Sequence, residues 1–154
     1  MESVLFVCTG NICRSPTAEA VLKHRIIGTR LENRLRIDSA GTHGYHIGEP
    51  PDERAIHMAL QHGIAMDGLR ARKVEPNDFK HFDLILAMDS GHLRHLQRIV
   101  PRGSTAEVRL FLDYSGHMPE IDVPDPYYGS AHDFEEMFNL IDTGTIGMLK
   151  KLAT

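Results

Sequence analysis

Cysteine is scarce in this sequence: only two of its 154 residues, Cys8 and Cys13, are cysteines, and both lie near the N-terminus. Small secreted domains that are held together by disulfides carry many more, so that class of protein is excluded. A chain with so few cysteines is typical of a reducing compartment. We therefore expect a cytoplasmic location.

Long apolar stretches and an excess of positive charge are also missing. No apolar run approaches the roughly 20 residues that cross a bilayer, and the first three residues lead into a short apolar segment rather than a signal peptide. We therefore expect no membrane partner. The net charge of −4 does not favour a nucleic-acid partner.

What is present is ordinary for a globular protein: 42% of the residues are hydrophobic and 25% are charged. A chain of this length suggests one domain, residues 1–154, that buries a core of useful size.

Short apolar runs rich in β-branched residues alternate with segments of helical periodicity. Strands are predicted at residues 4–7, 35–40, 83–88 and 107–112. Helices are predicted at 15–27, from 52 to a stop at Gly63, at 76–79, from 89 to Pro101, and from 131 on, with a bend or break at Gly144 and Gly147. This alternation predicts an α/β fold whose parallel sheet is covered on both faces. In such folds the ligand lies beyond the carboxyl ends of the strands.

The segment Cys8-Thr9-Gly10-Asn11-Ile12-Cys13-Arg14-Ser15-Pro16 lies between the first predicted strand and the first predicted helix. Ser15 is a good N-cap and Pro16 suits the first helical position. A tight loop that enters a helix N-terminus has unpartnered backbone N–H groups and a favourable helix dipole. The segment is therefore an expected anion site.

Two reactive side chains bracket this loop. Cys8 is a potential nucleophile, because helix N-termini and nearby cations favour the thiolate form of cysteine. Arg14 can hold two oxygens of a phosphate at once. A cysteine six residues before an arginine also arises by chance, and buried cysteines are often inert. The strand, the glycine and the Ser-Pro helix start around the pair favour the functional interpretation.

With Val7 in front, these residues resemble the phosphate loop of the low-molecular-weight protein tyrosine phosphatases. The resemblance implies a flavodoxin-like three-layer fold with a four-stranded parallel sheet. It implies hydrolysis of phosphotyrosine and aryl phosphates through a cysteinyl-phosphate, with no metal and no cofactor. Cys8 would be the nucleophile, Arg14 the phosphate binder and Asp125 the general acid and base.

Asp125 belongs to a long predicted loop, residues 113–130, that contains three prolines. Its Asp125-Pro126-Tyr127-Tyr128 segment matches the general-acid loop of the family, although Asp-Pro is also a common turn dipeptide. A loop of this length is usually functional or disordered.

The resemblance assigns phosphate contacts to the loop residues Thr9, Gly10, Asn11, Ile12, Cys13, Arg14 and Ser15. Asn11 would order the loop or simply serve as a turn residue. Ser15 would hydrogen-bond the Cys8 thiol, cap the helix, or do both. Cys13 would form a reversible disulfide with Cys8, or else fill space. Asp89 would support the site without taking part in the chemistry.

The predicted substrate is a phosphotyrosine-containing protein, bound by a monomer or weak homodimer. Tyr45, Tyr127 and Tyr128 would form a rim that stacks on the phenyl ring. Family members that act on phosphoarginine tend to have threonine where this chain has Ile12, which favours tyrosine.

One position departs from the family. Leu69 stands where a histidine often links to the phosphate loop, so the usual support of Asn11 is missing. The ten histidines, including the pairs His92/His95 and His43/His46, have no cysteine or carboxylate at ligand spacing. We expect them on the solvated surface and predict no metal site.

Three alternative functions fit the sequence less well. An arsenate reductase of the same fold needs further cysteines, and none follows Cys13. A phosphate-binding module without catalysis would need neither Cys8 nor Asp125. A nucleotide-binding P-loop requires Gly-Lys-Ser/Thr, which does not follow the loop.

Overall fold

The computed structural model describes residues 1–116 and 118–152. Four strands form one parallel sheet in the order β2-β1-β3-β4. Their bounds are β1 Ser3–Cys8, β2 Arg36–Gly41, β3 Leu84–Ala87 and β4 Glu107–Leu110. The predicted α/β class with a four-stranded parallel sheet is confirmed. The predicted domain of residues 1–154 includes residues 117, 153 and 154, which lie outside the described residues, as does His117 of the predicted 113–130 loop.

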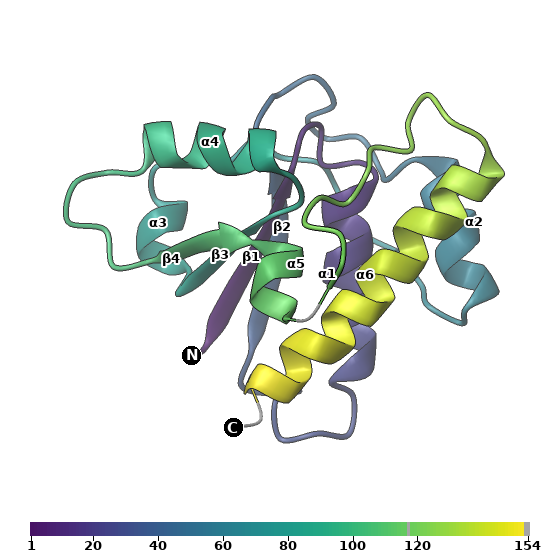
Figure 1. Ribbon diagram of the computed structural model, residues 1–154, viewed down its shortest axis with the longest axis horizontal. Helices are drawn as coiled ribbons and strands as arrows, with labels where there is room; N and C mark the ends of the chain where they lie inside the picture. Colours follow the sequence, from purple (N-terminus) through teal and green to yellow (C-terminus); the bar gives the residue numbers. More distant parts are fainter. Residues whose placement is uncertain (117, 153–154) are drawn as a thin grey trace.

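Helices cover both faces of the sheet (Figure 1). They are α1 Arg14–Arg25, α2 Glu53–Gln61, α3 Asp78–His81, α4 Ser90–Ile99, α5 Phe111–Ser115 and α6 Ala131–Leu152. Side chains alternate along β1, because successive residues of a strand point to opposite faces. Val4 and Phe6 pack in the core under α1, α2, α5 and α6, and Leu5 and Val7 pack in the core under α3 and α4. Within the described residues, no helix is long and apolar enough to cross a membrane.

The strand predicted at residues 107–112 is too long. β4 ends at Leu110, and α5 begins at Phe111. The apolar run is continuous across this boundary, so its composition does not reveal the change. The Phe111 side chain is fully buried and meets the Phe6 ring edge-on at 5.6 Å. Because α5 extends to Ser115, the loop predicted from residue 113 begins later than expected.

The bend or break predicted in the last helix is wrong. α6 is continuous over 22 residues, and its two interior glycines serve close packing. A Cβ on Gly144 would lie 2.7 Å from the Phe111 ring, and one on Gly147 would lie 2.4 Å from the Ser115 carbonyl oxygen. The absence of side chains lets α5 lie directly against α6.

Helix starts were predicted with mixed success. Asp52 and Asp89 cap α2 and α4, as expected. Ser15 is not a cap, because α1 begins at Arg14 with Cys13 in the cap position. The Ser15 hydroxyl turns toward Cys8 instead. α1 ends at Arg25, two residues earlier than predicted.

Candidate active site

The phosphate loop, which we define as residues 8–15, connects the carboxyl end of β1 to the first turn of α1. Among the described residues, none accepts a hydrogen bond from the backbone N–H groups of residues 9–14. Asn11 has a φ of 59°, a left-handed conformation that side-chain-bearing residues rarely adopt. Free N–H groups next to a helix N-terminus form an anion site.

Cys8 and Ser15 are in direct contact at the base of this loop. The Cys8 Sγ atom lies 2.9 Å from the Ser15 hydroxyl oxygen, and both residues are buried. The same hydroxyl oxygen accepts a hydrogen bond from the Asn11 side-chain amide at 2.8 Å. The bond from Asn11 does not use the hydroxyl proton, so Ser15 can donate that proton to the sulfur at 2.9 Å or to the more distant Ala40 carbonyl oxygen at 3.4 Å.

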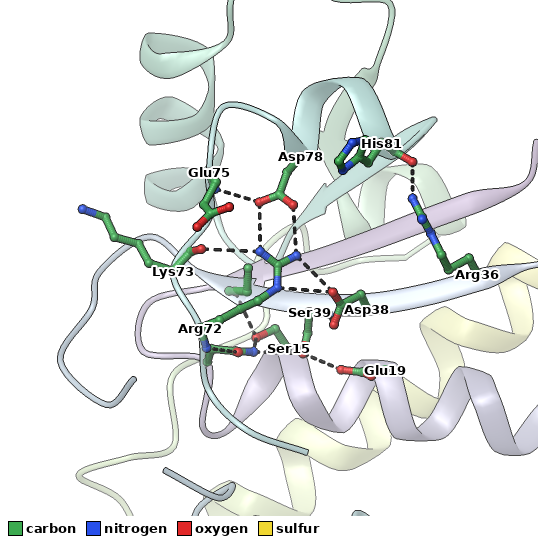
Figure 2. A network of polar contacts seen from close by, with 12 residues as sticks. Ser15, Glu19, Arg36, Asp38, Ser39, Arg72, Lys73, Glu75, Asp78 and His81 are labelled. Carbon is green, nitrogen blue, oxygen red and sulfur yellow. Dashed lines mark hydrogen bonds and ion pairs between the residues drawn. The ribbon is translucent and has the colours of Figure 1, made fainter. Parts of the chain in front are cut away.

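Asn11 is held from three parts of the chain. Its amide nitrogen also donates to the Ser39 hydroxyl of β2 at 2.9 Å, and its carbonyl oxygen accepts from the backbone N–H of Arg72 at 3.0 Å. Ser39 in turn donates to the buried Glu19 carboxylate of α1 at 2.6 Å. Figure 2 shows Ser15, Ser39, Glu19 and Arg72 in this network. Asn11 is therefore well supported, although the family resemblance led us to expect a missing support at Leu69.

The Arg72 side chain fixes the segment that reaches Asn11. Figure 2 shows its guanidinium between Asp38 of β2 and Asp78 of α3, and each carboxylate lies 3.0 Å from Nη2. Burial lowers the pKa of Arg72, but the two carboxylates outweigh burial and raise the pKa above its ordinary value. This clamp was not predicted, because its partners are far apart in the sequence.

Arg14 is almost fully buried, and its guanidinium contacts the start of α4 and the segment between α5 and α6. Its Nη1 atom donates to Asp89 Oδ2 at 2.8 Å and to the carbonyl oxygen of Val123 at 3.0 Å. Its Nη2 atom lies 3.6 Å from Asp125 Oδ2. Burial raises the pKa of Asp89, but the backbone N–H of His92 and the Arg14 charge outweigh burial and lower the pKa below its ordinary value. Asp89 thus stays ionised and anchors one edge of the guanidinium.

Cys13 differs from Cys8 in its surroundings. Burial raises the pKa of the Cys13 thiol well above its ordinary value, and the Asp52 and Cys8 charges raise it further. Cys13 is therefore a neutral thiol within the loop. Both cysteines are free and buried.

The structure brings most of the predicted site residues around one cavity. Its walls consist of Cys8, Thr9, Gly10, Ile12, Cys13, Arg14, Tyr45, His46, Asp125, Tyr127 and Tyr128. Tyr45 and Tyr128 are 72% and 94% exposed, so their rings stand at the mouth. Tyr127 meets Tyr128 edge-on at 4.9 Å. Asn11, Ser15 and Asp89 do not line the cavity. Ser15 and Asp89 contact Cys8 and Arg14, which do, and Asn11 contacts Ser15.

Two histidines near the cavity were missed in the sequence. His46 lies against Gly10, and its Nδ1 is 2.6 Å from a Glu49 carboxylate oxygen. His92 was predicted on the solvated surface, and this is wrong because it is only 5% exposed. The signal was its position four residues before Leu96, which puts His92 on the buried face of α4. Among the described residues, no group of three or more His, Cys, Asp or Glu side chains is placed to hold a metal ion.

Comparisons with known proteins agree with this geometry. Residues 3–154 match the family model of low molecular weight phosphotyrosine protein phosphatases. The low molecular weight phosphotyrosine protein phosphatase of Schizosaccharomyces pombe is 44% identical over 97% of this chain and 96% of its own length. The crystal structure of YfkJ from Bacillus subtilis has a TM-score of 0.91 and 42% identity, covering 99% of this chain and 95% of that one.

A further solved structure has a different substrate in its name. The Drosophila arginine phosphatase DARP has a TM-score of 0.91 and 31% identity, and the match covers 98% of each chain. The family match, the near full-length identities and the shared fold lead to one conclusion: this chain belongs to the low molecular weight phosphotyrosine protein phosphatase family and is a phosphatase.

Proposed function

We propose that this enzyme hydrolyses phosphotyrosine and aryl phosphates through a cysteinyl-phosphate intermediate. One observation carries the proposal: the Cys8 thiol, the Arg14 guanidinium and the Asp125 carboxylate line the same cavity at the carboxyl end of the sheet. The names of the relatives, which specify phosphotyrosine, support it.

In the first step the Cys8 thiolate attacks phosphorus, so that an S–P bond forms and the ester P–O bond breaks. The hydrogen bond from Ser15 stabilises the negative charge on the sulfur. The backbone N–H groups of the phosphate loop and Arg14 bind the equatorial oxygens while their charge redistributes. Asp125 gives its proton to the departing phenol oxygen, since a phenolate is otherwise a poor leaving group.

In the second step water attacks the cysteinyl-phosphate. Asp125, now a carboxylate, takes a proton from that water, the S–P bond breaks, and inorganic phosphate leaves with the Cys8 thiolate restored. The positive field comes from arginine, backbone amides and the helix N-terminus, so these steps need no metal.

The cavity walls favour a flat aromatic ring. Ile12 presents an apolar side chain inside the loop, and the exposed Tyr45 and Tyr128 rings stand at the rim. A phosphoserine is too short to reach Cys8 past such a rim. The likeness to an arginine phosphatase makes phosphoarginine the substrate to compare against tyrosine.

Cys13 is assigned a protective role in this proposal. Peroxide oxidises the Cys8 thiolate to a sulfenic acid, and the neutral Cys13 thiol condenses with it to a disulfide with release of water. Thiol reductants then restore the enzyme. A Cys13→Ser variant should lose this recovery, and equal recovery after peroxide would remove the redox role.

The physiological setting is proposed in the same terms. The partner is a phosphotyrosine-containing protein in the cytoplasm, and the enzyme acts as a monomer or weak homodimer without nucleic acid or membrane. Sedimentation over a range of protein concentrations checks the oligomeric state.

A substrate panel tests the function. An aryl phosphate and matched phosphotyrosine, phosphoserine and phosphoarginine peptides are assayed with the native enzyme and with Cys8→Ser, with and without a chelator. We expect turnover of the first two substrates only, a loss of roughly 10⁴-fold or more in Cys8→Ser, and no effect of the chelator. Near-native turnover by Cys8→Ser would contradict the mechanism, as would inactivation by the chelator.

A further inference from the structure

We propose that His92 is a positioning residue which, as a neutral imidazole acting with Thr9, fixes the orientation of the Arg14 guanidinium for phosphate binding. This inference rests on the proposed function in one respect, since it takes Arg14 as the group that holds the phosphate.

The contacts of four residues, including one backbone N–H, form a closed ring. Nε2 of His92 lies 2.7 Å from the Thr9 hydroxyl oxygen and 3.5 Å from Nη2 of Arg14. The Thr9 oxygen also accepts from that Nη2 atom at 3.5 Å. On the other side, the backbone N–H of His92 donates to Asp89 Oδ1 at 2.9 Å, and Asp89 Oδ2 accepts from Nη1 of Arg14 at 2.8 Å. Both terminal nitrogens of Arg14 are therefore included in the ring.

The second ring nitrogen of His92 indicates where its proton lies. Nδ1 is 3.2 Å from Asp89 Oδ1. Among the residues that the structure describes, it is the one buried side-chain nitrogen or oxygen without a hydrogen-bond partner. A proton on Nδ1 is attracted by this nearby carboxylate although the two groups form no hydrogen bond, whereas a lone pair there would be repelled by it. The tautomer with Nδ1–H is therefore favoured.

This tautomer also fits the hydrogen bonds around Nε2, the other ring nitrogen. Nε2 then carries a lone pair that accepts the Thr9 hydroxyl proton, while the Thr9 oxygen accepts an N–H of Arg14. The opposite tautomer would direct an N–H of His92 toward an N–H of Arg14. Only an unprotonated Nε2 is compatible with both neighbours.

Burial, together with the Arg14 charge, keeps His92 neutral. It faces Arg14 from α1, Asp89 at the start of its own helix, and Asp122 and Asp125 from the segment between α5 and α6. Burial and the Arg14 charge lower the pKa of His92 to about 4, in spite of the three carboxylates. Protonation would add a second cation beside Arg14 and remove the acceptor that Thr9 uses.

The consequence concerns the free enzyme. Asp89 and the Val123 carbonyl oxygen occupy Nη1, and the Thr9–His92 pair holds one side of Nη2. The guanidinium is then fixed in its plane before substrate arrives. Fixed donors bind a developing charge without the cost of reorganisation, which is how electrostatic catalysis gains its advantage.

Phosphate binding to a set of variants tests the role. His92→Leu removes both ring nitrogens, His92→Gln keeps a neutral polar group near Nε2, and Thr9→Val removes the hydroxyl while keeping its shape. His95→Leu is the control on the same helix. Calorimetry measures the affinity for inorganic phosphate, kinetics measure kcat and KM for an aryl phosphate, and thermal unfolding measures stability.

We expect His92→Leu and Thr9→Val to bind phosphate about tenfold more weakly, the effect of one or two lost hydrogen bonds. His92→Gln should recover most of this loss, and His95→Leu should match the native enzyme. Unchanged phosphate affinity in His92→Leu, or equal losses in the Gln and Leu variants, would overturn the proposal. If His92→Leu does not fold, Thr9→Val decides the question: a loss of about tenfold in phosphate affinity supports the ring, and unchanged affinity refutes it.

Imidazole nitrogen NMR reads the tautomer directly and needs no turnover. The native His92 should show a protonated Nδ1 and an unprotonated Nε2 from neutral pH down to about pH 5, with ionisation at a pH of about 4. A proton on Nε2, or ionisation near the ordinary value of 6.5, would refute the assignment. An inactive native enzyme would instead refute the proposed function, so the two failures are distinguishable.

Discussion

Two loops meet at the active site, and they are held in opposite ways. In the phosphate loop, Asn11 and Arg14 are nearly fully buried and bond to groups far away in the sequence. In the acid loop, which we define as residues 118–130, Val123 is anchored to Met88 by a backbone hydrogen bond. Beyond it, the Asp125 side chain is 48% exposed.

This difference fits the two tasks that we propose for the loops. A site for a phosphate needs donors that stay fixed while charge redistributes, and buried hydrogen bonds from several elements supply that rigidity. A proton donor must reach the leaving oxygen in the first step and the attacking water in the second, which suits a partly exposed carboxylate. Changes in the phosphate loop should therefore affect every substrate. Changes in the acid loop should depend on the leaving group.

Asp125→Asn should give the largest difference in activity loss between substrates with poor and good leaving groups. Removal of the acid should lower kcat on phosphotyrosine by roughly 10²–10⁴-fold. Aryl phosphates with acidic phenols should lose far less, because their leaving groups need no proton. A series of aryl phosphates of graded phenol acidity checks this dependence. An equal loss across the series would mean that Asp125 is not the acid.

Arg14→Lys changes the phosphate loop and should lower the activity on all substrates. Lysine keeps the charge but cannot contact Asp89, Val123 and a phosphate together. We expect kcat/KM to fall by roughly 10²–10³-fold with good and poor leaving groups alike. The affinity for inorganic phosphate should fall as well. A loss confined to poor leaving groups would contradict the division between the loops.

Ser39→Ala tests the support behind the phosphate loop. The substitution removes the partner of one Asn11 N–H and of one oxygen of the buried Glu19 carboxylate, whose other oxygen keeps Lys23. We expect a loss of about 1–3 kcal/mol in the free energy of unfolding, together with a lower kcat/KM. Urea unfolding measures the first quantity. Ser104→Ala, which removes a half-buried hydroxyl on the other side of the sheet, is the matched control and should leave kcat/KM unchanged.

The smallest effect is expected for Tyr128→Ala at the tip of the acid loop. This side chain is 94% exposed and contacts the Tyr127 ring. Stability should change by less than about 0.5 kcal/mol, and turnover of a small aryl phosphate should be native. Only KM for a phosphotyrosine peptide should rise. A large loss of stability would show that the tip is better anchored than its exposure suggests.

Sequence patterns identified the elements better than their boundaries. The run before Cys8 and the run at residues 83–88 were identifiable as buried strands, because both faces of a central parallel strand are apolar. The same rule failed at Phe111 and Leu112, where an apolar run continues from a strand into a short helix. Gly144 and Gly147 were misinterpreted because glycine weakens a helix in isolation, and composition does not reveal the neighbour that requires it.

The candidate site divides in the same way. Cys8 and Arg14 could be named in advance from the junction of a strand, a loop and a helix. Asp125 could be named because its segment resembles the general-acid loop of the family. His92 was placed on the surface, although its spacing from Leu96 was visible. The Arg72 clamp and the link from Glu19 through Ser39 to Asn11 had no local signal, because each joins residues from different elements.

The sequence by itself determined the alternation of strands and helices and the chemistry of one loop, because both depend on residues close together in the chain. Only the tertiary structure decided how that chemistry is supported. Parallel strands bring their carboxyl ends to one edge of the sheet, and there Ser39, Arg72, Asp89 and Val123 meet a loop that lies far from them in the sequence. A buried charge or amide must find partners among whatever the fold brings near, and that selection is a property of three-dimensional packing.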